Sequence, residues 1–146
     1  MQKIKTCLWF EKNAEEAARY YVSLFKSGKI LSVNPVVTAF EIEGNQFIAL
    51  NGGPHDSFND SISISVDCAN QAEVDELWEK LSTGGAGGRC GWLKDKYGVS
   101  WQIVPTALPK LMNDPDPKKS QRVMQAMLKM NKLDIAELER AANQQA

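Results

Sequence analysis

The chain repeats itself, because the order of its expected elements in the first half returns in the second half. A helix start marked by Asn13 and Glu16 recurs as Asn70 and Glu73, 57 positions later and without a gap. The apolar residues that follow each start share one face of a helix with 3.6 residues per turn. They are Ala17, Tyr20, Tyr21 and Leu24 in the first copy and Val74, Leu77, Trp78 and Leu81 in the second. Such a repeat restricts the fold to two similar modules in one chain.

Both helix starts have the residues of a capping box. Asparagine is a favourable N-cap, and an acid three positions later can reach back to the cap. We therefore expect helices from Asn13 to Leu24 and from Asn70 to Leu81, each capped by its own asparagine.

Short strands are expected around each helix. Gly44 and Gly98, 54 positions apart, each mark a hairpin turn before a run with an aromatic residue at the same place. Ile62, Ile64 and Val66 alternate with polar residues, which is typical of a half-buried strand. The expected strands cover residues 4–8, 30–33, 36–42 and 44–50 in the first copy, and 62–66, 90–93 and 98–104 in the second. The glycine-rich stretch 84–88 is expected to be a loop that ends a helix.

The order of strand, helix and about three strands, written twice, predicts an α+β fold of two βαβββ modules. The modules cover about residues 1–54 and 58–105, and together they form the paired part, residues 1–105. Residues 106–146 are expected to be a C-terminal helical extension of the same domain, with helices near 107–112, 118–130 and 134–143. In the last two helices, Val123, Met127 and Met130 share a face, as do Leu138, Ala141 and Ala142, so we expect these residues to pack.

Composition excludes several classes of function. The 146 residues suit one domain, and 17 Lys and Arg against 18 Asp and Glu leave a net charge of -1. This balance offers no basic surface, so nucleic acid is not an expected partner. The early apolar run Cys7–Phe10 is far too short to cross a membrane. Cys7, Cys68 and Cys90 are odd in number and show no CxxC spacing, so we expect small, buried, reduced thiols in a cytoplasmic protein.

A single βαβββ module leaves one face of its sheet bare, because one helix covers only the other face. Pairing two modules covers that face and can enclose a cleft. The sequence allows the modules to pair within one chain or across a homodimer.

Several segments carry a resemblance to a known family. They are Glu15–Ala17 with Tyr20–Phe25, Ala49–His55, Cys90–Pro105, and Asp114–Pro117 with Gln121–Met124. With them the chain resembles the vicinal oxygen chelate superfamily of glyoxalase I, bleomycin-resistance proteins and extradiol dioxygenases. Within that superfamily it resembles the PhnB-like group, which is labelled "3-demethylubiquinone-9 3-methyltransferase" domain proteins. The resemblance covers nearly the whole chain, and it implies the glyoxalase/bleomycin-resistance-like fold.

The resemblance also implies where a divalent metal would bind in superfamily enzymes. Transferred one at a time, the four ligand positions fall at Thr6, Ala49, Ser61 and Gln102. The first three lack the imidazole or carboxylate that holds a catalytic ion. We therefore expect no metal and no cofactor.

Five residues are candidates to bind a ligand in the cleft: His55, Asn51, Gln102, Trp92 and Trp9. His55 is the only histidine and could act as a base or an anchor, or could be a solvated loop residue. The amides of Asn51 and Gln102 could bind a ligand or satisfy backbone groups. Trp92 and Trp9 could line the cavity, whereas Trp101 and Trp78 are expected in the core.

Other patterns carry no catalytic motif. A GxGxxG started at Gly85 fails at Cys90 and follows a helix, so neither a dinucleotide nor S-adenosylmethionine has a recognisable site. The run Lys94-Asp95-Lys96 is expected to be a solvated turn.

We thus expect a PhnB-like protein that binds a small organic ligand in a cleft without a catalytic metal. The alternative is an enzyme, either a metal-dependent one of the glyoxalase or dioxygenase type or a demethylubiquinone methyltransferase. The sequence assigns no catalytic residue to such an enzyme.

Overall fold

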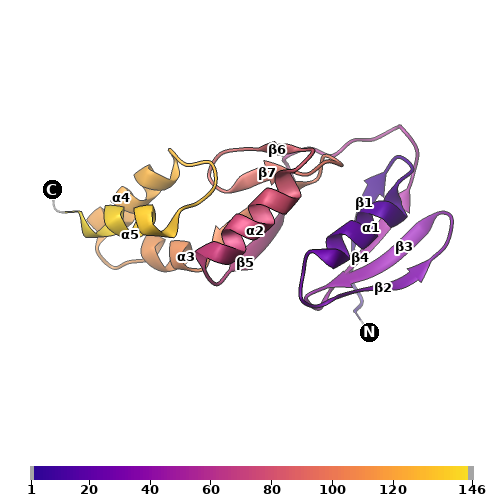
Figure 1. Ribbon diagram of the computed structural model, residues 1–146, viewed down its shortest axis with the longest axis horizontal. Helices are drawn as coiled ribbons and strands as arrows, with labels where there is room; N and C mark the ends of the chain where they lie inside the picture. The colour runs from indigo at the N-terminus through magenta and orange to yellow at the C-terminus, as the bar shows by residue number, and fades with distance from the viewer. Residues whose placement is uncertain (1, 145–146) are drawn as a thin grey trace. The chain divides into compact units, whose positions relative to one another are not determined.

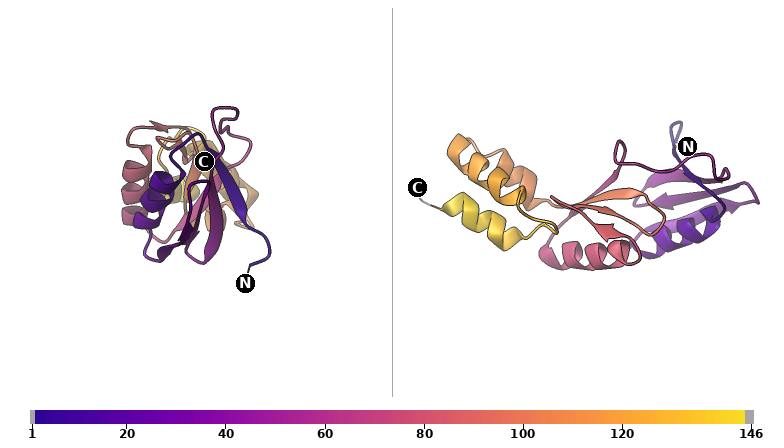
Figure 2. Two further views of the ribbon diagram at one scale, coloured as in Figure 1. Left: turned by 90° about the vertical axis from the view of Figure 1, so that its right-hand side faces the viewer. Right: turned by 90° about the horizontal axis from the view of Figure 1, so that it is seen from above.

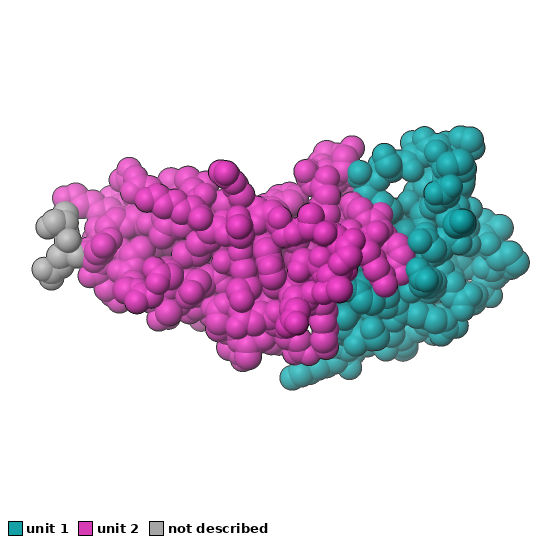
Figure 3. Space-filling view, turned by 45° about the horizontal axis from the view of Figure 1, so that its top comes forward, with its two compact units in different colours: residues 1–58 teal, residues 59–146 magenta. Residues whose placement is uncertain are grey.

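The computed structural model describes residues 2–144. The chain divides into two compact units, residues 1–58 (unit 1) and residues 59–146 (unit 2), which Figure 3 shows in different colours. No helix among the described residues is long and apolar enough to span a membrane.

Unit 1 is one βαβββ module. Its elements are β1 (Thr6–Phe10), α1 (Ala14–Ser23), β2 (Gly28–Val33), β3 (Val37–Ile42) and β4 (Asn45–Asn51) (Figure 1). The sheet order is β1-β4-β3-β2, with β1 parallel to β4 and the other pairs antiparallel. The register between β2 and β3 shifts between Ile30 and Ser32, which marks a β-bulge.

Unit 2 repeats this topology. Its first elements are β5 (Ile64–Cys68), α2 (Gln71–Ser82), β6 (Ala86–Gly87), β7 (Trp92–Lys94) and β8 (Ser100–Pro105). The sheet order is β5-β8-β7-β6, again with the first and last strands parallel. The repeat read from the sequence is therefore confirmed, and so is the α+β fold of two βαβββ modules.

Some boundaries differ from the expectation. Ile4 is 86% exposed and Ile62 is 63% exposed, because both precede the strand that they were expected to join. The glycine-rich stretch is more than a loop, since Ala86 and Gly87 pair with β7 as a two-residue strand. Glycines carry no alternating side-chain pattern, so periodicity could not reveal β6.

One helix covers one face of each sheet (Figure 2). In unit 1, the rings of Phe10 and Phe40 lie 6.5 and 6.1 Å from that of Tyr21 on α1. Directly paired residues on neighbouring strands point to the same side of a sheet. By their register, Leu8, Phe47 and Ala49 lie on this helix-covered face, and all three are buried.

The opposite side of each sheet is called its open face below. Alternation along the strands places Cys7, Trp9, Ile48 and Leu50 on the open face of unit 1. In unit 2, Trp101 and Ile103 are fully buried on the helix-covered face, so Trp92, Gln102 and Ser65 lie on the open face.

The two helix starts are capped differently. Asn70 caps α2 as expected, since its side chain accepts a hydrogen bond from the Glu73 N–H at 2.9 Å. Asn13 makes no side-chain cap bond, so that prediction was wrong for α1. The Asn51 side chain takes its place, with Oδ1 accepting from the Ala14 N–H at 2.8 Å. A cap from another strand leaves no local pattern in the sequence.

The C-terminal extension consists of α3 (Ala107–Met112), α4 (Pro117–Met127) and α5 (Ile135–Asn143). The three helices share a small apolar core, made of Leu108, Val123, Leu133, Leu138 and Ala142. Met127 and Met130 pack against it as expected. Arg122 ties α4 to the end of α5, because Nε and Nη2 donate to the carbonyls of Ala141 and Ala142 at 3.0 and 2.8 Å.

Candidate ligand-binding site

The five candidate residues fall into two groups, one in each unit. Trp9, Asn51 and His55 lie in unit 1, whereas Trp92 and Gln102 lie in unit 2. Each group is described by its own contacts.

In unit 1, the Trp9 indole organises the loop after β4. Its Nε1–H donates to the Gly53 carbonyl at 2.9 Å, and the backbone of Gly52 lies against the ring. A Cβ atom on Gly52 would approach the ring to 2.2 Å, so only glycine fits at this position. Trp9 is half-buried, and its polar group is already used inside the protein.

In Asn51, both polar atoms of the side-chain amide are likewise hydrogen-bonded within the protein. Oδ1 caps α1, and Nδ2 donates to the Pro35 carbonyl at 3.1 Å. Of the two interpretations open for this residue, the contacts favour the one in which it satisfies backbone groups.

His55 lies in the exposed loop that follows. Its imidazole lies near Gly53, where a Cβ atom would be 3.6 Å from Cδ2. The described residues therefore place Trp9, Asn51 and His55 at one end of the unit 1 sheet, with only the imidazole free of a protein hydrogen-bonding partner.

In unit 2, Trp92 and Gln102 are direct partners on β7 and β8. Both are half-buried on the open face, and the Gln102 Nε2–H donates to the Ser63 hydroxyl at 3.0 Å. Since Oε1 of Gln102 has no hydrogen-bonding partner among residues 2–144, this amide retains an acceptor on the open face.

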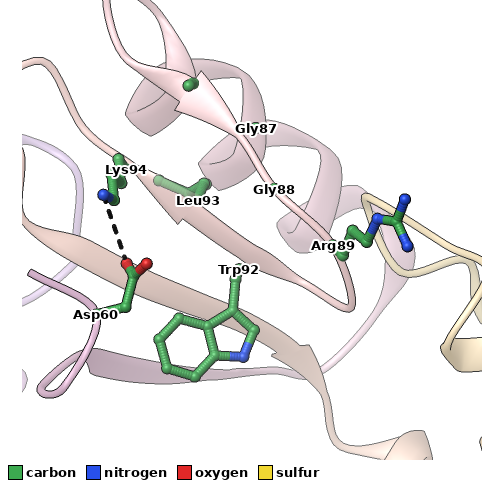
Figure 4. Close-up of a pocket in the computed structure, with 8 residues that line it drawn as sticks. Asp60, Gly87, Gly88, Arg89, Trp92, Leu93 and Lys94 are labelled. Carbon is green, nitrogen blue, oxygen red and sulfur yellow. Dashed lines mark ion pairs between the residues drawn. The ribbon is translucent and has the colours of Figure 1, made fainter.

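Beside Trp92 lies a pocket of about 620 Å³ (Figure 4). Its lining comes from the loop before β5, from β6 and its following loop, and from β7: Asp60, Ala86, Gly87, Gly88, Arg89, Trp92, Leu93 and Lys94. This volume is in the usual range for small-molecule sites. The glycines make one wall of bare backbone, while the Trp92 ring provides a flat apolar surface.

The charges of the pocket are unequal. Lys94 Nζ lies 3.8 Å from Oδ1 of Asp60, and the same carboxylate accepts from the Ser100 hydroxyl at 2.7 Å. The Arg89 guanidinium makes no ion pair with any described residue, and its side chain is exposed at the end of the pocket (Figure 4). Two cations against one carboxylate leave one positive charge uncompensated, which favours an anionic group in a ligand.

Directly after Lys94, Asp95 fixes the turn between β7 and β8. The residue is 2% exposed, and its Oδ1 accepts from the N–H groups of Tyr97 and Val99 at 2.9 and 3.1 Å. Its Oδ2 accepts from the Trp101 indole at 2.9 Å. The expectation of a solvated turn was therefore wrong for Asp95, although Lys94 and Lys96 are exposed. In the sequence, the two flanking lysines made Asp95 resemble part of a charged, exposed turn.

The structure corrects three of the four inferred metal positions. Ser61 lies in the turn before β5 and on no strand, so Ser65, the partner of Gln102, takes its place on the open face of unit 2. Thr6 and Ala49 lie on the helix-covered side of the unit 1 sheet, and Ala49 is completely buried. The neighbouring strand positions on the open faces are Cys7 and Ile48 in unit 1 and Ser65 and Gln102 in unit 2. Neither pair includes the imidazole or carboxylate donors of a catalytic divalent metal. Among residues 2–144, no group of three or more His, Cys, Asp or Glu side chains has an arrangement that could hold a metal ion.

The three cysteines differ in environment. Cys68 is fully buried as expected, Cys90 is half-buried, and Cys7 is exposed, which contradicts the expectation for that residue. Burial, with help from the nearby carboxylates of Glu73 and Asp67, raises the pKa of the Cys68 thiol to about 11. Trp101 lies in the core as expected, whereas Trp78 is half-buried against Gly87.

Solved structures share this architecture. The PhnB protein of Bacillus cereus is 32% identical, with a TM-score of 0.69 over 72% of this chain and 100% of that one. Protein PA1353 of Pseudomonas aeruginosa is 20% identical, with a TM-score of 0.58 over 72% and 98%. A glyoxalase-related enzyme of Fulvimarina pelagi is 13% identical, with a TM-score of 0.51 over 73% and 91%. The last two likenesses concern the fold alone.

No curated protein matches the sequence. The sequence profile of the 3-demethylubiquinone-9 3-methyltransferase family matches residues 2–104 and ends before α3. The doubled βαβββ topology agrees with this match. The chain belongs to the 3-demethylubiquinone-9 3-methyltransferase family, the PhnB-like group within the glyoxalase/bleomycin-resistance/dioxygenase fold.

Proposed function

We propose that the chain binds a small organic anion with a flat apolar group in the pocket of unit 2, and that binding needs no catalytic metal. The observation that carries this proposal is that the Trp92 ring and the uncompensated cation of Arg89 both belong to the lining of one pocket of about 620 Å³. A flat group would stack on the indole while the anion meets the guanidinium. The open acceptor of Gln102, beside Trp92, would add a hydrogen bond.

The metal-free part of the proposal rests on donor chemistry. The open-face positions offer one thiol in unit 1 (Cys7) and a hydroxyl and an amide in unit 2 (Ser65 and Gln102), which are insufficient to hold a Lewis-acidic divalent ion. In this proposal, the ligand is bound by stacking and charge.

Binding can be tested with benzoate and benzyl alcohol, which share a ring and differ in charge. We expect calorimetry to show binding of benzoate, and at least tenfold weaker binding of benzyl alcohol. Trp92→Ala and Arg89→Ala should each weaken benzoate binding, whereas Arg19→Ala, which removes an exposed arginine of α1, should not. Equal affinities for the two compounds, or insensitivity to Arg89→Ala, would refute the anion site.

An enzyme is the competing proposal, because the family description names a methyltransferase. Calorimetry with S-adenosylmethionine tests it directly, and saturable binding would favour methyl transfer over simple ligand binding. The metal-dependent version predicts that purified protein carries a divalent ion and loses activity on chelation. In either version with His55 as a base, His55→Ala should abolish turnover, whereas benzoate binding in unit 2 should be unchanged.

We further propose a cytoplasmic homodimer whose 146 residues act as one domain, with residues 106–146 as its helical extension. Light scattering after gel filtration should give twice the monomer mass of 16.2 kDa. Calorimetric unfolding should show one transition, and two separate transitions would contradict the single domain.

A further inference from the structure

The segment 130–133, which joins α4 to α5, lies against the turn that precedes Trp92. The Cys90 N–H donates to the Met130 carbonyl, and the Gly91 N–H donates to the Asn131 carbonyl, both at 2.8 Å. On its other side, the Gly91 carbonyl accepts from the Ile103 N–H of β8 at 2.8 Å. The turn is therefore held between the C-terminal extension and the sheet.

This turn has an unfavourable conformation that needs such support. Cys90 has a φ of 58° and Gly91 a φ of 85°, and a non-glycine residue in this region is costly. A Cβ atom on Gly91 would lie 2.9 Å from the Ile103 carbonyl oxygen and 3.0 Å from Cδ1 of Leu133. The close approach of segment 130–133 thus depends on glycine at position 91.

The turn also determines the relative positions of the two pocket residues on which the proposed function depends. Arg89 lies directly before it and Trp92 directly after it, and the Trp92 N–H donates back to the Arg89 carbonyl at 3.0 Å. A change in the turn would move the guanidinium and the indole relative to each other.

Gln71, at the start of α2, fastens segment 130–133 from the other side. Its Nε2 donates to the Leu133 carbonyl at 3.0 Å, and its Oε1 accepts from the Ile135 N–H at 2.8 Å. Nε2 also lies 2.9 Å from Oδ1 of Asp75, which forms an ion pair with Lys132 at 2.9 Å. Hydrogen bonds from Gln71 and Lys132 lower the pKa of the Asp75 carboxyl.

We infer that Gln71 is a positioning residue for the pocket, acting through segment 130–133 on the Cys90–Gly91 turn and hence on Arg89 and Trp92. The effect on a ligand rests on the proposed function, whereas the effect on the turn does not. Because the family match ends at residue 104, segment 130–133 belongs to the part of the chain that the match does not include, whereas Gln71 and the turn lie within it. The C-terminal extension then shapes the wall of the pocket in addition to packing its own core.

Gln71→Met tests the inference, because methionine keeps the length of the side chain and removes both hydrogen-bonding groups. We expect amide hydrogen exchange at Cys90 and Gly91 to accelerate about tenfold or more. The Trp92 indole resonance, identified by its loss in Trp92→Phe, should shift, and benzoate should bind several-fold more weakly. Gln125→Met, on the exposed side of α4, is the matched control and should change none of these readouts.

A rise of the Asp75 pKa in Gln71→Met would show that the hydrogen bond from Gln71 has been removed. If exchange at Cys90 and Gly91 and the Trp92 resonance are then unchanged, the inference is overturned. If they change but native protein binds no benzoate, positioning stands and the proposed function fails. Should Gln71→Met not fold, Lys132→Ala loosens the same segment from the surface, and it must shift the same resonances in the same direction.

Discussion

The side-chain oxygen of Asn51 accepts a hydrogen bond from the backbone N–H of Ala14 at 2.8 Å, so the last residue of β4 caps the first helix. The residue next to that helix, Asn13, contributes no such bond. The cap therefore joins two elements that are distant in sequence.

A pair of alanine substitutions distinguishes the two asparagines. Asn51→Ala should lower the free energy of unfolding by about 1–2 kcal/mol, because the N–H of Ala14 and the Pro35 carbonyl lose their partners. Asn13→Ala should change it by less than about 0.5 kcal/mol. Urea unfolding of both variants measures the difference, and the reverse ranking would place the cap at Asn13.

The buried Asp95 provides a second test. In Asp95→Asn the side chain has one oxygen and one NH2 group in place of two oxygens. If the oxygen faces the two backbone N–H groups, the NH2 group faces the Trp101 indole N–H; if the amide is flipped, the NH2 group faces the backbone N–H groups. We expect a loss of about 2 kcal/mol of stability, since either the Trp101 indole N–H or the two backbone N–H groups lose their acceptor. Asp56→Asn in the exposed loop serves as the control and should have almost no effect. If Asp95→Asn left the free energy of unfolding unchanged, the turn would be solvated and the prediction would be wrong.

Gly52 and Trp9 should be energetically coupled. Gly52→Ala would force a methyl group against the indole and should destabilise the protein by about 2 kcal/mol. In a Trp9→Ala background the same substitution should cost much less, because the ring is gone. A double-mutant cycle by chemical unfolding measures the coupling. Additive effects would show that the close contact with the ring does not limit position 52.

From the raised pKa of the Cys68 thiol we predict a loss of stability at high pH. Its pKa of about 11 in the folded state exceeds the ordinary value of 9.0, so the unfolded chain releases this proton first. The contribution of the protonated Cys68 thiol to the free energy of unfolding is fully present below pH 9. It is lost as the pH rises toward 11, and the total loss is about 2 kcal/mol. Unfolding of the native protein and of Cys68→Ala between pH 8 and 11 measures it. Parallel pH profiles for the two proteins would contradict the assignment.

Local patterns in the sequence were enough to predict the doubled module. The helix stripes of Tyr21 and Leu81 follow a period of 3.6, and the glycine turns repeat at constant spacing, so each element could be recognised within its own segment. The short helix at Ala107–Met112 was located to the residue by its flanking turn signals.

The candidate site was harder to predict, because its geometry depends on pairing between distant segments. Side chains alternate along a strand, so an error of one residue assigned Ala49 to the open face although it is completely buried. The Arg89 and Asp60 ends of the pocket come from loops without periodic pattern, and sequence reasoning did not select them. Trp92 was selected as a candidate, but the residues that surround it could only be found in three dimensions.

The bulge between Ile30 and Ser32 has a consequence for solubility. In the described part of the chain β2 pairs only with β3, and it carries Leu31 and Val33, each 43% exposed, on a free edge. A flat edge with these residues would be a template for strand addition and aggregation, and a bulge twists such an edge out of register with an incoming strand. By this argument the bulge disfavours the addition of another strand at the β2 edge of the first module.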